Sequence, residues 1–443
     1  MMSSQLTALY ELSPGLQIGE FDSSNAAKTY RVELSTGVHF QVNDKVYQLL
    51  SSLDSPLTLV GLAAEFQQRT GQSVALDQLQ QLCDRFVGQG LLVECTPDGR
   101  QRTSQPAEPP APNGALLGLH YRRDLFAAKT LAPIANALTI FFYRPVAIVL
   151  MTLVALAHIL AYRVIGFHWD IKAIQGPFFY LLLLVSVVIH ELGHLAACRR
   201  WNCPHGPLGV GLYFLNPVFY VDVTAAWRLS RHQRAVVDLG GLYLQLLCAP
   251  LFWLGFLFTH DATYLYAIAV IDMVLLFNFI PMMKLDGYWL LSDLAGVPNL
   301  HARTGEVITY VVRWVLWRLG RLPMQPEKLA FAQWPLNVRL VVIAYVVLSL
   351  LNWPLMLLMM AMALVSGIAT YPAVWQAAIV AVGKAFQTHH YAALLPQFNA
   401  LFLPILMVLN VIFVLKTVWD RRRKARAAKA LHAAKPTLVQ QPA

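Results

Sequence analysis

The chain has 443 residues, of which 57% are hydrophobic and only 13% are charged. Soluble domains carry about 25% charged residues and disordered chains are poor in apolar ones, so both classes are excluded and a membrane protein with several spans remains. The formal net charge of +10 therefore indicates membrane topology before it indicates a nucleic-acid surface.

Residues 1–95 have the composition of a soluble domain. The elements predicted there are strands at 28–34 and 38–42, a short helix capped by Asn43 or Asp44, helices at 58–70 and 74–87, and a last strand at 91–94. This order is typical of a small α+β winged-helix domain. The N-terminus lacks the basic and apolar regions of a signal peptide, so we expect this domain in the cytosol. Its few Lys and Arg residues predict no nucleic-acid partner.

A Pro-rich polar linker at 96–113 separates this domain from a hydrophobic remainder. We divide the remainder into a first membrane region at 114–300, additional transmembrane helices at 301–420 and a basic cytosolic tail at 421–443. Apolar runs long enough to cross a bilayer, about 20 residues each, lie near 145–162, 177–198, 235–259, 262–284, 338–364 and 397–415.

Three further segments are predicted not to cross the membrane. Residues 116–143 and 305–322 are basic and amphipathic, which is typical of helices that lie along the membrane surface. The weakly apolar residues 366–395 are predicted to form an external loop or a re-entrant segment.

Basic residues cluster in alternate connections between the predicted spans. They precede the first span, lie between spans two and three and between spans four and five, and follow the sixth span as the run 421–424. By the positive-inside rule, the fold class is a polytopic α-helical membrane protein with about six spans. We expect it in a bacterial inner membrane, in contact with the lipid bilayer and with both termini in the cytosol.

The second predicted span ends in the pentapeptide HELGH, residues 190–194. His190 and His194 are one helical turn apart, so their rings share a face and can bind one Zn²⁺. Glu191 is placed to act as general base toward an attacking water, and Gly193 permits the close approach of another element. Ionisable groups at the end of an apolar span are costly to bury without a partner, so we interpret them as a metal site.

A catalytic zinc site needs a third protein ligand and one open position. The fourth predicted span ends in the tripeptide LDG at 285–287. Because this end and the HELGH end both lie at the cytosolic side, Asp286 is predicted to be the third ligand. Asp272 lies about 20 Å away along the same predicted helix, and we assign it no role.

HELGH at 190–194 and NFIPMMKLDG at 278–287 lie on separate predicted spans. Together they resemble the site-2-protease class of intramembrane zinc metallopeptidases, over roughly residues 115–300. The resemblance implies that the region 114–300 is a peptidase core. It also implies that His190, His194 and Asp286 are zinc ligands and that Glu191 is the catalytic base.

The same resemblance implies two amides that contact the substrate. Asn278 would hold the substrate backbone or the developing oxyanion. The family pattern Gly-Pro-x-x-Asn reads Gly-Leu-Tyr-Leu-Gln at 241–245, so Gln245 stands where the family has a substrate-binding Asn. Residues 206–223 resemble the membrane-associated β-hairpin of the family, whose edge can accept an extended substrate. A hairpin that only packs on the lipid surface is the alternative.

The N-terminal domain resembles the PqqD-like winged helix of ribosomal peptide systems. This resemblance implies that residues 1–95 bind a leader peptide as an added strand. A generic winged helix that acts in assembly is the alternative.

The leading hypothesis is a zinc endopeptidase that cleaves a peptide or membrane-associated precursor near the cytosolic face, with its N-terminal domain recruiting the substrate. Such an enzyme would act in peptide maturation or export. A second hypothesis is a non-proteolytic membrane scaffold that works with an HlyD-like adaptor protein and an ABC transporter. A third is regulated cleavage of a membrane-bound signalling protein, which fits the catalytic motifs better than it fits the N-terminal domain.

Overall fold

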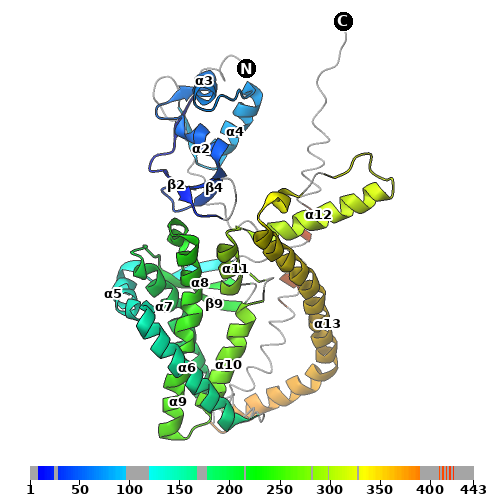
Figure 1. Cartoon of the computed structure of the whole chain (residues 1–443). Coiled ribbons are helices and arrows are strands. Elements are labelled where there is room, and N and C mark those ends of the chain that lie inside the picture. Colours follow the sequence, from blue (N-terminus) through cyan, green and yellow to red (C-terminus); the bar gives the residue numbers. More distant parts are fainter. Residues whose placement is uncertain are drawn as a thin grey trace.

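A small N-terminal sheet domain lies at one end of a larger helical body (Figure 1). The structure is a computed structural model that describes residues 8–23, 28–95, 119–166, 177–213, 216–280, 283–297, 299–326, 329–389 and isolated positions between 409 and 423. The predicted linker at 96–113 and most of the tail at 421–443 lie outside the described residues.

The N-terminal domain contains two three-stranded antiparallel sheets, ordered β5-β1-β6 and β2-β3-β4. Its elements are β1 (Leu9–Leu12), β2 (Gln17–Phe21), β3 (Thr29–Glu33), β4 (His39–Asn43), α2 (Asp44–Ser51), β5 (Leu57–Thr58), α3 (Leu59–Thr70), α4 (Leu76–Gly88) and β6 (Leu92–Cys95). Apolar faces of the helices and sheets share one core, in which Leu50 and Leu62 are fully buried.

Local sequence explains most of these elements. The β3–β4 hairpin turns at Gly37, whose φ of 81° favours glycine. Asn43 caps α2 by accepting the Val46 amide at 2.9 Å, and Thr58 caps α3 by accepting the Gly61 amide at 3.1 Å. The predicted β3, β4, α2, α3, α4 and β6 are thus confirmed. The strands β1, β2 and β5 were not predicted.

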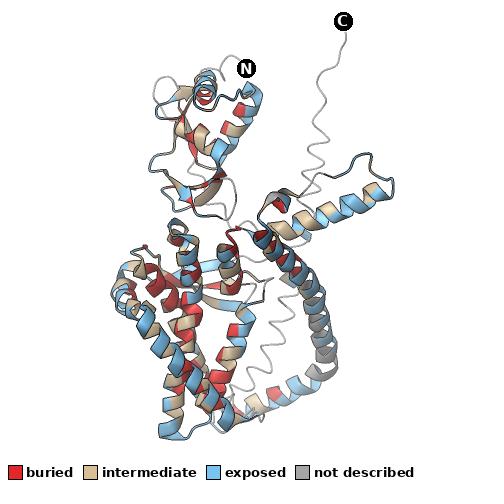
Figure 2. Ribbon diagram, in the orientation of Figure 1, coloured by how far each residue is buried: buried red, intermediate tan, exposed pale blue. Residues whose placement is uncertain are grey.

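The helical body carries a third sheet and most of the helices. Its elements are β7 (Leu119–Phe126), α5 (Ala128–Leu138), η1 (Thr139–Phe142), α6 (Arg144–Ile165), α7 (Pro177–Arg200), β8 (Leu208–Tyr213), β9 (Asn216–Val221), η3 (Thr224–Arg228), α8 (Arg231–Leu246), α9 (Cys248–Thr259), α10 (Thr263–Asn278), α11 (Asp286–Ala295), α12 (Leu300–Arg318), η4 (Ala330–Gln333) and α13 (Leu336–Gln387). Burial is densest in α7, α8 and α10, which form the centre of the body (Figure 2).

Among the described residues, three helical stretches are long and apolar enough to cross a membrane: α6, α7 and the joined run of α8 and α9, Arg231–Thr259. They coincide with the first three predicted spans. Large apolar side chains such as Ile148 on α6 and Phe258 on α9 are 67% and 85% exposed, which suits lipid as the surrounding solvent.

The prediction of six spans is not confirmed. Helix α10 is apolar but ends at Asn278, short of the predicted 262–284. The predicted span 338–364 lies within α13, and 397–415 lies mostly outside the described residues.

One local prediction was wrong, and a second was wrong in one of its two alternatives. Residues 116–143 were expected to form one surface helix, but 119–126 are strand β7, which pairs with β8 about ninety residues away in the chain. Tertiary pairing therefore overrides the local pattern, and the helix begins only at Ala128. Residues 366–395 were predicted to form an external loop or a re-entrant segment, but 366–387 continue α13, a helix of 52 residues, so they are not a loop. Alanine and other residues of high helix propensity surround Pro372, so the helix continues past this proline.

Candidate metal centre

Three predicted zinc ligands converge in the structure. His190 and His194 come from α7, and Asp286 is the first residue of α11. The Nε2 atom of His190 lies 2.9 Å from Oδ2 of Asp286, and the Nε2 atom of His194 lies 3.6 Å from Oδ1. The ligand atoms of all three residues lie within 4.8 Å of one another. Asp286 was expected at the end of a span, but it instead opens a separate short helix.

The outer nitrogen of each histidine ring is held by an acceptor on or near α8. His194 Nδ1 donates to the backbone carbonyl of Val237 at 2.7 Å, and His190 Nδ1 donates to Oε1 of Gln245 at 3.0 Å. Since each Nδ1 carries the proton, each Nε2 presents a lone pair toward Asp286. This is the orientation that metal-bound histidines adopt.

The converging atoms fit a cation. The two Nε2 atoms lie 3.2 Å apart, and their lone pairs point at each other and at a carboxylate. The Oδ2 atom of Asp286 is buried and accepts no hydrogen bond from the described residues. A cation between the three groups would relieve this repulsion, and two histidines with one carboxylate suit a catalytic Zn²⁺ with one open position.

Helix α8 approaches α7 unusually closely at the site. A Cβ atom on Gly193 would lie 2.1 Å from the carbonyl oxygen of Gly240, so the two helices touch through main-chain atoms. A Cβ atom on Gly241 would lie 2.4 Å from His194 Nε2 and 2.6 Å from His190 Nε2. The prediction that Gly193 permits close approach is confirmed, and Gly241 leaves the space in front of the ligand nitrogens clear.

Glu191 lies beside the ligands and against the third sheet. Its carboxylate is buried and accepts a hydrogen bond from the backbone amide of Val221 in β9. The backbone of the next residue, Asp222, bonds on the β8 side. Its amide donates to the Pro207 carbonyl, and its carbonyl accepts from the Gly206 amide. Backbone groups alternate along a strand, so the Val221 amide points away from β8. The outer edge of β9 therefore borders Glu191.

The hairpin expected over 206–223 is confirmed as β8 and β9. The two strands pair in register from Leu208 with Val221 to Tyr213 with Asn216. The tip of the hairpin reaches the loop before Asp286, because the Tyr213 hydroxyl accepts the backbone amide of Lys284 at 3.2 Å.

The two amides predicted to bind substrate lie in different settings. Gln245 is buried and donates to the Ser186 hydroxyl at 3.3 Å while it accepts from His190. Asn278 ends α10, and its amide donates to the carbonyl of Val274 at 3.0 Å. Their roles toward substrate stay predictions. Pro281, in the same motif, lies outside the described residues.

Several residues that support the site were not predicted. Ser186 lies one helical turn before His190, so its spacing on α7 was a usable signal. Arg234 and Asp238 are one turn apart on α8, and both lie by Asp293 of α11. Charges within an apolar span were a signal here too, but their partner could not be identified from spacing alone.

Asp272, which had no assigned role, links α10 to α6. It accepts hydrogen bonds from Nε2 of His158 at 2.9 Å and from the Tyr162 hydroxyl at 2.7 Å. It is thus a polar contact between helices, remote from the metal ligands.

A comparison with curated proteins finds one informative relative. Over 114 residues the chain is 30% identical to a Bacillus subtilis (strain 168) protein named "Putative peptide zinc metalloprotease protein YydH". The match covers 25% of this chain and 45% of that protein, so it spans less than half of the relative's length. No family model matches the chain, and no solved structure matches it. The similarity supports a zinc metallopeptidase-like family.

Proposed function

We propose that this protein is a site-2-protease-like intramembrane zinc endopeptidase that cleaves a peptide or membrane-associated precursor near the cytosolic face. The observation that carries the proposal is the convergence of His190, His194 and Asp286 beside the buried Glu191. The similarity to the Bacillus subtilis protein supports the same chemistry.

A zinc ion held by these three residues would supply a Lewis acid that polarises the scissile carbonyl and lowers the pKa of water. The chain supplies the proton transfers. Glu191 takes the proton of the attacking water and returns it to the leaving amine. The buried Glu191 carboxylate lies next to the Val221 amide and interacts electrostatically with both histidines. Asn278 is proposed to hold the substrate backbone or the oxyanion.

The outer edge of β9 is the proposed substrate platform. A helical substrate hides its peptide bonds, so it must be unwound before it is cut. Pairing with β9 would satisfy the freed backbone groups and run the extended peptide past Glu191. The N-terminal domain, proposed to be PqqD-like, would recruit the peptide by the same kind of strand addition. Both termini are proposed to lie in the cytosol, beside the inner membrane.

The test is the Glu191→Gln variant of the full chain. It should bind zinc as the parent does and lose cleavage by about 10²- to 10⁴-fold, since general-base catalysis is worth that much. The substrate is obtained by purifying this variant from its host and identifying the bound peptide by mass spectrometry. Glu65→Gln, on α3 of the N-terminal domain where the side chain is 36% exposed, is the matched control and should cleave normally.

Two results would remove the proposal. One is a Glu191→Gln variant that cuts the captured peptide at the parental rate. The other is a parent protein that binds zinc and never cuts it, which would favour the scaffold with an HlyD-like adaptor and an ABC transporter.

A further inference from the structure

The N-terminal domain is joined to the helical body by a defined polar and aromatic contact. Arg228 of η3 forms a two-pronged ion pair with Glu33 of β3, with Nε 3.0 Å from Oε2 and Nη2 on Oε1. The Trp227 ring lies 5.4 Å from that of Phe21 and 6.1 Å from that of His39. Burial raises the pKa of Glu33, but the bond from Arg228 brings it below its usual range, so the pair is charged.

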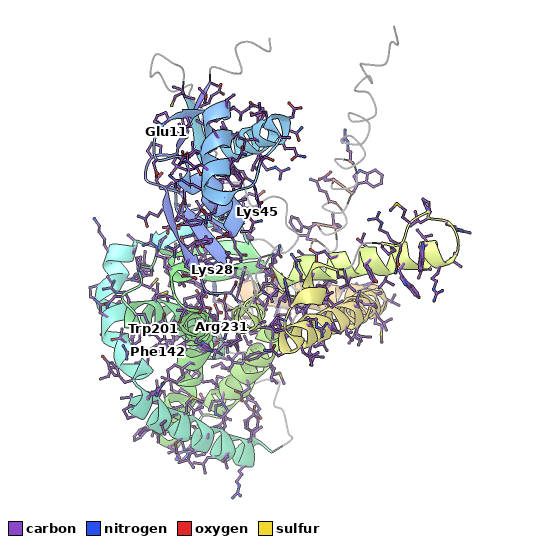
Figure 3. The ribbon with its side chains drawn as sticks, turned by 45° about the horizontal axis from the view of Figure 1, so that its top comes forward. Glu11, Lys28, Lys45, Phe142, Trp201 and Arg231 are labelled. Carbon is purple, nitrogen blue, oxygen red and sulfur yellow. The ribbon has the colours of Figure 1, made fainter. Side chains whose placement is uncertain are left out.

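The same domain caps helix α8. The backbone amide of Arg231, the first residue of α8, donates to Oδ2 of Asp22 at 3.0 Å. A carboxylate at a helix N-terminus is favourable because it meets unpaired amides and the positive end of the helix dipole. Figure 3 shows the labelled Arg231 in the body beneath the N-terminal domain, with Lys28 at the lower end of that domain.

Arg234, one turn further along α8, binds both parts of the molecule at once. Its guanidinium donates to the Asp22 carbonyl at 3.1 Å and lies 4.5 Å above the Phe21 ring in the N-terminal domain. It also donates to Oδ1 of Asp293 in α11 at 2.8 Å and to the Leu229 carbonyl at 2.9 Å. The residue is 2% exposed. A buried guanidinium is costly to leave unpaired, so its contacts are strongly coupled.

Asp293 lies seven residues after the metal ligand Asp286 on the same short helix. Seven residues are nearly two helical turns, so both carboxylates lie on the face of α11 that meets α8. Burial raises the pKa of Asp293, and its side chain lies within hydrogen-bond reach of Asp238 on α8. One end of this face is therefore held by Arg234, and the other end presents Asp286 to the histidines.

We infer that Arg234 is a positioning residue through which docking of the N-terminal domain holds α11, and with it Asp286, in the metal-binding position. The inference rests on the proposed zinc site and adds a regulatory coupling to it. Coupling between two sites is reciprocal, so metal binding also strengthens docking. A peptide that loosens the dock on binding the N-terminal domain would loosen Asp286, and one that tightens the dock would complete the site.

The test undocks the domain without touching the ligands. Arg228→Glu places a carboxylate against Glu33, and Trp227→Ala removes the ring between Phe21 and His39. For each full-length variant in detergent, docking is measured by hydrogen exchange of the Arg231 amide, which donates to Asp22 across the contact, and zinc affinity by competition with a chromophoric chelator. Undocked variants should bind zinc about tenfold more weakly, within the usual range for allosteric coupling. The swap Glu33→Arg with Arg228→Glu should restore both readings.

Arg69→Glu is the matched control, because it breaks ion pairs with Asp54 and Glu65 within the N-terminal domain. It should leave zinc affinity unchanged. Asp293→Asn cuts the link inside the body and should weaken zinc binding by a similar factor. If Arg234 carries the coupling, adding Arg228→Glu to Asp293→Asn should cause no further loss.

The inference is overturned if zinc affinity stays at the parental value when the Arg231 amide exchanges freely. It is also overturned if the losses from Asp293→Asn and Arg228→Glu multiply, because the domain would then act by another route. A parent protein that binds no zinc would instead remove the proposed function itself.

Discussion

The two histidines of the candidate metal centre are oriented by different kinds of group. His194 is held by a main-chain carbonyl, at Val237, whereas His190 is held by a side-chain amide, at Gln245. Gly241 lies against the Nε2 atoms of both rings. Because it has no Cβ atom, these nitrogens have room to approach Asp286. The lack of a side chain at Gly241 is therefore as necessary to the site as the two histidines and Asp286.

The variant Gly241→Ala should lower zinc affinity by at least about tenfold, as other changes around metal ligands do. The added carbon would lie 2.4 Å from His194 Nε2, so α8 or the ring must shift. Zinc affinity is measured by chelator competition. The control is Gly305→Ala on α12, where an added Cβ meets nothing within 4 Å and should stabilise the helix slightly. Unchanged zinc binding in Gly241→Ala would disprove this account of the site.

At the scale of single elements, strand β9 has two edges that contact different partners. One side pairs with β8, and the other turns the Val221 amide toward Glu191. Val221→Pro removes this amide at an edge position, where strands tolerate proline. We expect zinc binding to persist while cleavage falls by about tenfold or more, since one charge-assisted hydrogen bond contributes about 1.5–3 kcal/mol.

Val221→Ala keeps the amide and is the control for this strand. It should cleave the captured peptide at close to the parental rate. Equal activity in Val221→Pro and Val221→Ala would show that neither the amide nor the strand edge takes part in the reaction.

Elements and site residues were predictable where the signal was local. Residues close together in the sequence determine the caps at Asn43 and Thr58 and the apolar run of α7. They also determine the pair of His190 and His194, which are one helical turn apart. Strands β1 and β7 were missed because their partners, β6 and β8, are distant in sequence. For the same reason the Arg234–Asp293 pair could not be inferred, although the convergence of Asp286 on HELGH was expected from topology and motif resemblance.

For the whole molecule, the N-terminal domain and the α9–α10 connection lie at opposite ends of the helical body (Figure 1). The described cysteines, which include all five in the chain, are buried, so introduced thiols can be labelled with little background. With cytosolic termini, Lys45→Cys on α2 should react with a membrane-impermeant maleimide only after lysis. Asp261→Cys, between α9 and α10, should react in intact spheroplasts.

The reverse labelling pattern would invert the proposed orientation and place the metal ligands near the opposite face. Labelling of both thiols in intact spheroplasts would mean that the helices between them do not separate two compartments. Either result would be independent of whether the protein cuts peptides.

The contact between His194 and the Val237 carbonyl has a consequence for how the sequence can vary. A main-chain acceptor survives any side-chain replacement at its position, so no exchange at Val237 alone deletes it. Inserting or deleting one residue between Val237 and Gly241 is different, because it rotates the two relative to each other by about 100° around α8. We therefore expect working versions of this protein to vary at the exposed Leu239 while the number of residues between Val237 and Gly241 stays fixed.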